Sequence, residues 1–234
     1  MKVEVCRVSE TSLIIYFGHS IDLQLIERIA LFSHAVQEKY QGKIFEVIPS
    51  YTTLLIEYHP LKVDIQELMD WCQTQADKMA HFCIGGDKAV ISKSKTVTFP
   101  VYYHPDVAPD LERIAKEKQL SVQQVIDIHS QKEYTVCAIG FAPGFAFLGV
   151  VDTKIATPRR SEPRLKVAKG SVAIADEQTA IYPQQTPGGW QIIGNCPIDL
   201  FNIELDPMMP FEVGDKVRFE PISREQFLAL GGML

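Results

Sequence analysis

The chain has 234 residues, of which 46% are hydrophobic and 22% are charged, and its 29 acidic and 23 basic side chains give a formal net charge of −6. This composition excludes intrinsic disorder, and no apolar run approaches the ~18 residues that cross a bilayer. The net acidity argues against nucleic acid as a partner, because neutralising phosphates takes concentrated Lys and Arg.

The first ninety residues alternate strand-like and helix-like segments. Apolar or alternating runs predict strands at 3–8, 13–17, 44–48 and 52–58. Apolar residues three to four apart predict one helix that begins at Ser20, its expected cap, and ends at Gly42, and a second from about Asp64. The order predicts a small α/β sandwich in which two helices cover one face of the sheet.

The pattern changes after a polar stretch at 85–95, which we interpret as a linker. A strand is expected at 96–102, followed by short helices at 110–119 and 121–130, the second capped by Ser121. Beyond Tyr134 short β-type runs are broken every eight to twelve residues by Gly and Pro, which is typical of a barrel or sandwich. We therefore predict an α+β chain of two domains, residues 1–88 and 89–234.

The five cysteines are odd in number and widely spaced, without a CxxC or a Cys/His ligand pattern. This argues against a disulfide framework and a metal site, and it suits a reducing compartment. The first residues also lack the basic-then-apolar plan of a signal peptide. We expect a cytoplasmic protein that binds neither a metal nor a membrane.

Glycine and aromatic residues are densest at 140–149, where three phenylalanines, Phe145 among them, alternate with three glycines and a proline. Glycine lets the backbone approach a ligand closely, and an aromatic ring supplies apolar contact with little loss of entropy. The alternative is a tight loop whose phenylalanines plug the end of a barrel. The residue types alone leave both open.

A basic stretch follows, in which residues 151–170 hold six basic and two acidic side chains. Arg159 and Arg164 lie in a segment stiffened by two prolines, and a guanidinium fork suits a carboxylate or a phosphate. The alternative is a solvated loop whose arginines pair with Glu162 and other surface acids.

Two further features are candidates for chemistry. Gly188 and Gly189 precede Trp190, which indicates either a loop that places an aromatic wall near backbone amides or a hairpin with a buried Trp190. His129, with Glu133 close by, could transfer protons, although a lone histidine is more often structural. No GxSxG, HExxH or strand-following GxGxxG motif occurs.

Five segments occur in the order and spacing of one known family: HSQKEY (129–134), GFAPGFAFLG (140–149), TPRRSEPR (157–164), KGSVAIADEQTAIYP (169–183) and TPGGWQIIG (186–194). The chain resembles the family of the bacterial 5-oxoprolinase B subunit. That family also includes a Kip-type inhibitor of a sensor histidine kinase and half of the carboxyltransferase region of urea carboxylase, often called allophanate hydrolase subunit 1. The resemblance implies an N-terminal α/β domain and a C-terminal cyclophilin-like β-barrel.

The resemblance also implies a function: a non-autonomous subunit, inactive alone, of an ATP-dependent 5-oxoprolinase that hydrolyses 5-oxoproline to L-glutamate. Its expected partners are a larger barrel subunit of C type and a third subunit of A type, and ATP is bound by the complex. Phosphorylating the lactam oxygen would make that oxygen a leaving group. The alternatives are a Kip-type kinase inhibitor and a carboxyltransferase subunit.

The implied site residues fall into two sets. Those expected to be catalytic are His129, Arg159 and Arg164. Those expected to bind substrate are Phe145, Ser171, Gln178, Thr179, Tyr182, Gly188, Gly189 and Trp190.

Overall fold

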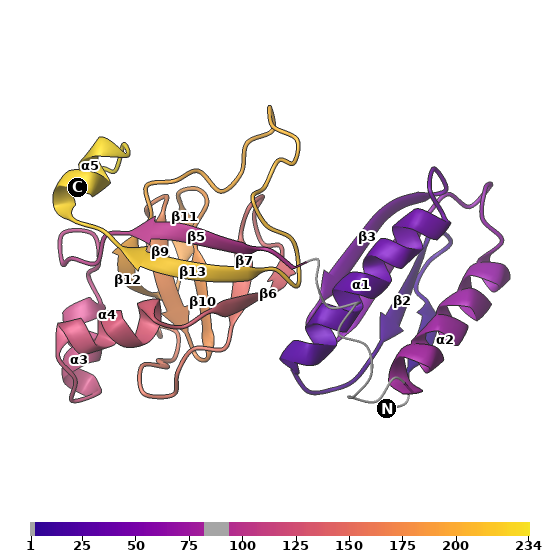
Figure 1. Cartoon of the computed structure of the whole chain (residues 1–234), viewed down its shortest axis with the longest axis horizontal. Coiled ribbons are helices and arrows are strands. Elements are labelled where there is room, and N and C mark those ends of the chain that lie inside the picture. Colours follow the sequence, from indigo (N-terminus) through magenta and orange to yellow (C-terminus); the bar gives the residue numbers. More distant parts are fainter. Residues whose placement is uncertain (1–2, 82–93) are drawn as a thin grey trace. The chain divides into compact units, whose positions relative to one another are not determined.

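The computed structural model describes residues 3–81 and 94–234, and the chain divides into two compact units, Met1–Ser94 and Lys95–Leu234 (Figure 1). The predicted domain boundary between residues 88 and 89, and most of the predicted linker at 85–95, lie outside the described residues. Each unit is described below by itself.

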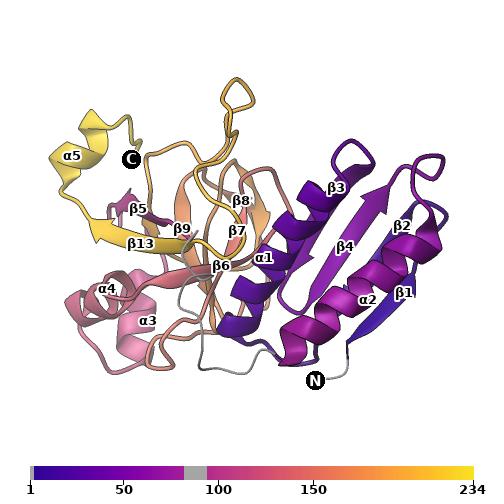
Figure 2. The ribbon, with the colours of Figure 1, turned by 45° about the vertical axis from the view of Figure 1, so that its right-hand side comes forward.

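The first unit is an antiparallel sheet with two helices on one face. Its elements are β1 (Glu4–Arg7), β2 (Ser12–Tyr16), α1 (Leu23–Lys39), β3 (Ile44–Ser50), β4 (Thr53–Tyr58) and α2 (Ile65–His81). The strands pair in the order β1-β2-β4-β3, and every pair is antiparallel. Figure 2 shows α1 and α2 side by side over this sheet. Both helices share one hydrophobic core with the strands, because each turns a periodic apolar face toward them.

One local prediction in this unit was wrong, and one strand is longer than predicted. The cap of α1 is Asp22, whose Oδ1 accepts a hydrogen bond from the Gln24 amide at 2.9 Å, and not Ser20. Ile21 is 58% exposed, so it lies outside the apolar face. Aspartate caps as well as serine, and Asp22 lies directly before the periodic apolar run. Strand β3 also continues to Ser50, so that the turn begins at Tyr51, with a φ of 35°.

The second unit is built mostly of antiparallel strands. Its elements are β5 (Thr96–Val101), α3 (Leu111–Glu117), α4 (Val122–Ser130), β6 (Tyr134–Ile139), β7 (Ala146–Gly149), β8 (Arg164–Val167), β9 (Ser171–Ala175), β10 (Gln178–Ile181), β11 (Thr186–Gly188), β12 (Gln191–Asn195), β13 (Lys216–Pro221) and α5 (Arg224–Ala229). Strand β13 pairs with β5 in parallel and with β6 antiparallel, and the order continues β6-β7-β10-β9-β12. Strands β8 and β11 form a separate ribbon. The chain is therefore a mixed α/β structure with mostly antiparallel sheet.

The short helix α4 begins as predicted. The Ser121 hydroxyl accepts a hydrogen bond from the Gln124 amide, and the Gln124 side chain accepts one in return from the Ser121 amide. This reciprocal cap satisfies two backbone donors that a helix start leaves without a partner. Within the described residues, no helix is both long and apolar enough to cross a membrane.

Strands β9 and β10 present different residues on their two faces, and this alternation positions the candidate site. Val172, Ile174 and Ile181 belong to the large core that also contains α3 and α4 residues. Ala173, Ala175 and Ala180 belong to a second cluster with aromatic side chains. Successive residues of a strand point to opposite faces, so one face is branched and bulky and the other is lined by alanine.

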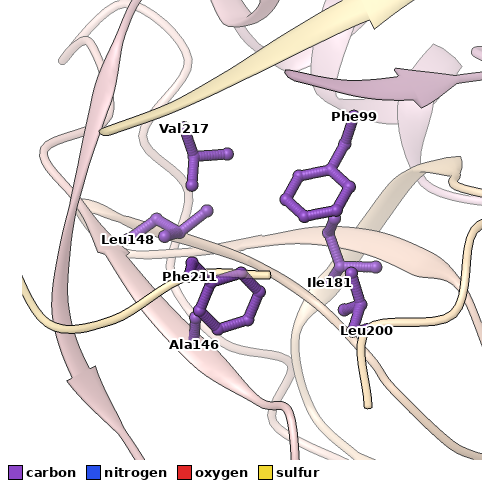
Figure 3. Close-up of a pocket in the computed structure, with 7 residues that line it drawn as sticks. All are labelled: Phe99, Ala146, Leu148, Ile181, Leu200, Phe211 and Val217. Atoms are coloured by element: carbon purple, nitrogen blue, oxygen red, sulfur yellow. The ribbon is translucent and has the colours of Figure 1, made fainter. Parts of the chain in front are cut away.

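The large core contains a small gap. Its cavity of about 10 Å³ is lined by Phe99, Ala146, Leu148, Ile181, Leu200, Phe211 and Val217 (Figure 3). The side chains that Figure 3 draws around it contain only carbon, and such apolar voids stay dry. This cavity is a packing gap of the core and not a ligand site.

Candidate functional site

Four aromatic rings pack on the alanine-lined face of β9 and β10, and we call Phe145, Phe147, Tyr182 and Trp190 the aromatic cluster. The Phe145 ring lies 5.3 Å from the Tyr182 ring and 5.7 Å from the Trp190 ring, both edge to face. The Phe147 ring lies 4.9 Å from Phe145 and 6.0 Å from Trp190. Alanine leaves the room for these rings to lie close to the sheet, so three predicted site residues meet here.

The loop that delivers Phe145 to the cluster has an unusual backbone. Phe141 has a φ of 72°, and its side chain is 67% exposed beside the Phe145 ring at 5.2 Å. Gly144 has a φ of 82°, and a Cβ there would lie 2.8 Å from Phe201 Cβ. The positive φ is costly for a bulky residue, and such strain gathers at functional sites. The loop therefore keeps an exposed ring at the edge of the aromatic cluster.

Gly188 is required by Tyr182. A Cβ at Gly188 would lie within van der Waals overlap of the Tyr182 hydroxyl, whereas the nearest atom to a Cβ at Gly189 is 3.7 Å away. Burial raises the pKa of the Tyr182 hydroxyl, while the Trp190 backbone amide and the charge of Arg159 act in the opposite direction. The Tyr182 hydroxyl stays protonated at neutral pH. Trp190, which follows the two glycines, is 5% exposed, so the structure fits the alternative of a buried Trp190.

The basic segment 157–164 is hydrogen-bonded to Gly189 and Trp190, which lie between β11 and β12. The Arg160 amide donates to the Gly189 carbonyl at 2.7 Å, and Arg164 Nη1 donates to the Trp190 carbonyl at 3.4 Å. Arg159 is exposed, and its guanidinium carbon lies 5.6 Å from the centre of the Trp190 ring. A cation over an indole face is attracted by the ring quadrupole. Arg159 is thus the exposed cation next to the aromatic cluster.

Sequence reasoning missed Asp110, which organises this region. Its carboxylate is 3% exposed, and one oxygen accepts from Arg164 Nη2 at 2.8 Å and lies 3.5 Å from Arg160 Nη1 and 3.7 Å from Arg113 Nη2. The other oxygen accepts from the Ile192 amide at 2.7 Å. Asp110 precedes a helix, where aspartate is expected as a cap, so nothing local indicated partners up to 82 residues away.

His129 lies in the large core, away from the aromatic cluster. Its ring is fully buried, with Nδ1 2.8 Å from the Tyr103 hydroxyl and Nε2 2.9 Å from the Thr179 hydroxyl. Since the Thr179 hydroxyl donates to the Ala173 carbonyl, it accepts from Nε2–H, and Nδ1 accepts from Tyr103. Burial lowers the pKa of His129 to about 3. The ring is neutral, and the geometry fits the structural alternative.

Thr179 points to the face of β10 on which His129 lies, whereas Ala180 lies on the opposite face, against which the aromatic cluster packs. Ser171 and Gln178 lie at opposite ends of the β9–β10 pair. At one end the Ser171 carbonyl accepts a hydrogen bond from the Tyr182 amide, and at the other end Gln178 pairs with Ala175. The structure therefore brings together one part of the predicted set: Phe145, Arg159, Arg164, Tyr182, Gly188, Gly189 and Trp190.

Comparison with known proteins decides the family. The model of the carboxyltransferase domain, subdomain C and D, matches residues 3–211. The chain belongs to this carboxyltransferase-domain family. It is 35% identical to the 5-oxoprolinase B subunit of Bacillus subtilis (strain 168), over 98% of this chain and 97% of that protein. It is 34% identical to the 5-oxoprolinase B subunit of Escherichia coli O157:H7, over 92% of this chain and 94% of that protein.

The resemblance that the motifs indicated is thereby confirmed. A relative from Haemophilus influenzae carries the same subunit name, so the kinase-inhibitor and urea carboxylase alternatives are not favoured. Among solved structures, TTHA0988 superposes with a TM-score of 0.77 over 95% of this chain at 26% identity, and this chain spans only 40% of its length. The Kluyveromyces lactis urea carboxylase, at 19% identity, shares the fold with a TM-score of 0.71 over 97% of this chain and 22% of its own.

In this member of the carboxyltransferase-domain family, the site consists of rings, glycines and guanidinium groups. Such groups bind and orient a ligand: arginine meets an anionic oxygen, and the rings cover an apolar face. Among residues 3–81 and 94–234, no group of three or more His, Cys, Asp or Glu side chains is placed to hold a metal ion. The arrangement therefore suits a small anion with an apolar side.

Proposed function

We propose that this chain is the B subunit of an ATP-dependent 5-oxoprolinase. The observation that carries the proposal is the 35% identity to the 5-oxoprolinase B subunit of Bacillus subtilis, which extends over nearly all of both proteins. The complex hydrolyses 5-oxoproline to L-glutamate and couples this reaction to ATP hydrolysis. Its further members are a larger subunit of C type and a third subunit of A type, and this chain alone is inactive.

The chemistry explains why the reaction needs ATP and several subunits. Amide resonance stabilises the five-membered lactam, and its ring carries little strain to drive opening. Transfer of a phosphoryl group from ATP to the lactam oxygen releases ADP and makes the ring carbon more electrophilic. Water then adds to this carbon, the C–N bond breaks to open the ring, and a second water releases the phosphate. ATP is bound by the assembled complex, and the residues of this chain contribute ligand contacts.

Within this chain, Arg159 and the partly exposed Phe147 are the proposed ligand contacts, and the buried rings of the aromatic cluster support them. The carboxylate of 5-oxoproline suits the exposed guanidinium of Arg159, and the apolar edge of the 5-oxoproline ring suits Phe147. Arg164 and Gly188 support these contacts indirectly. Arg164 donates a hydrogen bond to the Trp190 carbonyl, and Gly188 leaves room for the Tyr182 hydroxyl. We assign His129 to the core, because its ring has no exposed surface.

Glutamate release tests this function. We would incubate 5-oxoproline and ATP with this chain alone, with the A-type and C-type subunits added, and with those subunits but without this chain. Glutamate and inorganic phosphate are expected only from the full mixture. Turnover by the partners without this chain, or none from a verified full assembly, would contradict the proposal.

Substitution of Arg159 tests the proposed contact. Arg159→Ala is expected to lower kcat/KM for 5-oxoproline about tenfold to a hundredfold, as the loss of a hydrogen bond to a charged group does. The control is Arg218→Ala, because Arg218 is exposed on β13 and its guanidinium pairs with Glu133 at 2.9 Å. Co-purification of the subunits reports assembly. Normal turnover by the Arg159 variant would remove this arginine from the site.

We also propose that the second unit closes as a cyclophilin-like β-barrel. Strands β5 and β12 stand at the two ends of its strand order. Directly after β5, the Tyr102 amide donates to the Asn195 carbonyl and the Asn195 amide donates to the Tyr102 carbonyl, both at 2.9 Å. Such a reciprocal pair is the repeating unit of an antiparallel ladder, and here it supports closure of the sheet on itself.

A cytoplasmic location is proposed as well. Cys6, Cys72, Cys137 and Cys196 are free thiols, which suits a reducing compartment. Burial raises the pKa of Cys72 to about 12 and that of Cys196 to about 11, so these thiols stay protonated and unreactive. Fractionation of cells that express the chain tests this: we expect it in the cytoplasmic fraction, and recovery elsewhere would contradict it.

A further inference from the structure

Asp110 breaks a local rule of helix structure. It occupies the N-cap position of α3, where an aspartate side chain ordinarily accepts a hydrogen bond from the first turn, yet its side chain makes no such bond. Instead the carboxylate is buried and accepts hydrogen bonds from the basic segment and from β12. A residue that gives up the expected local bond for distant partners is a candidate for a functional role.

The contacts of Asp110 join three elements at one point. Its backbone amide donates to the Ile192 carbonyl at 3.1 Å while its carboxylate accepts from the Ile192 amide, so α3 and β12 are held by two bonds. The Arg164 and Arg160 guanidinium groups approach the same carboxylate from the basic segment. Arg159, the proposed ligand contact, is one residue before Arg160, and Trp190, whose ring lies under the Arg159 guanidinium, is two residues before Ile192.

A second set of bonds holds the same two segments. Gln191 Nε2 donates to the Pro158 carbonyl at 2.7 Å, and Gln191 Oε1 accepts from Arg113 Nη2 at 2.5 Å. Arg113 is on α3 and also pairs with Glu117 at 2.6 Å. The two neighbours of Arg159 in the chain, Pro158 and Arg160, are thus both held by hydrogen bonds, and the Arg159 guanidinium lies over the Trp190 indole.

We propose that Asp110 is a positioning residue, which holds Arg159 over the Trp190 ring and so presents the ligand-binding cation in one place. Three guanidinium groups converge on this single carboxylate, and without its charge they would repel one another. The segment would then move away from β12, and Arg159 would leave the indole. The effect on turnover rests on the proposed 5-oxoprolinase function, but the effect on geometry does not.

Fluorescence of Trp190 tests the geometry without any assay of activity. The chain has two tryptophans, so Trp71→Phe leaves Trp190 as the single reporter. In that background we expect Asp110→Asn to increase quenching of Trp190 by neutral acrylamide severalfold, because the basic segment no longer covers the buried indole. Asp127→Asn is the matched control, since Asp127 lies on α4 and its carboxylate pairs with Gln123. Equal quenching in the two variants would overturn the proposal.

Kinetics of the reconstituted complex separate positioning from plain stabilisation. Asp110→Asn is expected to raise KM for 5-oxoproline about tenfold, within the range for loss of a hydrogen bond to a charged group, and to change kcat much less. Because Asp110 acts through Arg159, the double variant Asp110→Asn/Arg159→Ala should be no worse than Arg159→Ala alone. Additive losses, or a fall in kcat with KM unchanged, would overturn this role.

Arg164 provides a second route if Asp110→Asn does not fold. Arg164→Gln breaks the same ion pair from its more accessible side and leaves the carboxylate bonded to Ile192. We expect the same rise in Trp190 quenching, and Arg164→Lys should restore part of the protection, because a cation again faces Asp110. If Arg164→Gln leaves quenching unchanged, the ion pair does not position the segment. An inactive wild-type complex with the expected quenching would reject only the proposed function.

Discussion

At the scale of single residues, His129 connects the fold to the pH dependence of stability. Its folded-state pKa is lowered by burial to about 3, from 6.5 for a free imidazole. Between these values the unfolded chain binds a proton that the folded chain excludes, so acid favours unfolding. Stability from this group is complete above pH 6.5 and is lost as the pH falls toward 3.

We therefore predict that the free energy of unfolding decreases between pH 6.5 and 5 with a contribution of up to about 1.4 kcal/mol per pH unit from His129. Urea unfolding at several pH values measures it. His129→Gln should flatten the slope, since glutamine does not titrate. If His129→Gln has the original slope, the ring is not held neutral.

At the scale of elements, the β8–β11 ribbon packs against the β9–β10 pair through Gly188 and Tyr182. A Cβ at Gly188 would overlap the Tyr182 hydroxyl, and this ring is buried among the aromatic cluster. We predict that Gly188→Ala destabilises the protein by about 1–3 kcal/mol, as overpacking does, and weakens Trp190 packing. The measurement is thermal unfolding followed by near-ultraviolet circular dichroism.

The adjacent Gly189 provides the control, because a Cβ there meets its nearest atom at 3.7 Å. Gly189→Ala should change stability by less than about 0.5 kcal/mol, the usual range for a substitution without a clash. Equal losses at the two glycines would mean that the ribbon tolerates no side chain at either position, and the specific contact with Tyr182 would not be the cause.

At the scale of the whole molecule, the proposed barrel closure of the second unit has a direct test. If β5 and β12 are joined, the amides of Tyr102 and Asn195 are protected and exchange with deuterium as slowly as those in the centre of β9. If the sheet is open, they exchange as rapidly as the amides of an exposed strand edge. Amide exchange followed by NMR on the intact chain distinguishes the two outcomes.

The sequence predicted those features that depend on neighbours along the chain. The helix cap at Ser121 and the order of elements in the first unit follow from local patterns, and both are found. The family resemblance also predicted that Arg159 and Trp190 belong to one site, because it covers both segments, and the two side chains are in contact. The prediction of Ser20 as the cap of α1 was wrong because Asp22, two residues further on, is an equally good cap, and spacing alone does not choose between them.

The features that escaped prediction depend on contacts between distant residues. Asp110 reads as a cap for α3, and only the folded chain reveals that its carboxylate meets Ile192 and Arg164. His129 and Thr179 were grouped with the site by their motif, yet the two-residue repeat of β10 turns Thr179 to the core. A shift of one position along a strand moves a side chain to the opposite face of the sheet, and a sequence motif does not specify the face on which each residue lies.

The alanine-lined face of β9 and β10 has a consequence for how such a protein can diverge. Changes at Ala173, Ala175 or Ala180 would reshape the floor beneath the rings and leave Val172 and Ile174, on the reverse side, to hold the core. Selection for a new ligand and selection for folding thus act on separate, interleaved positions. Descendants with altered substrate preference are expected to vary at the alanines and to keep the branched residues between them.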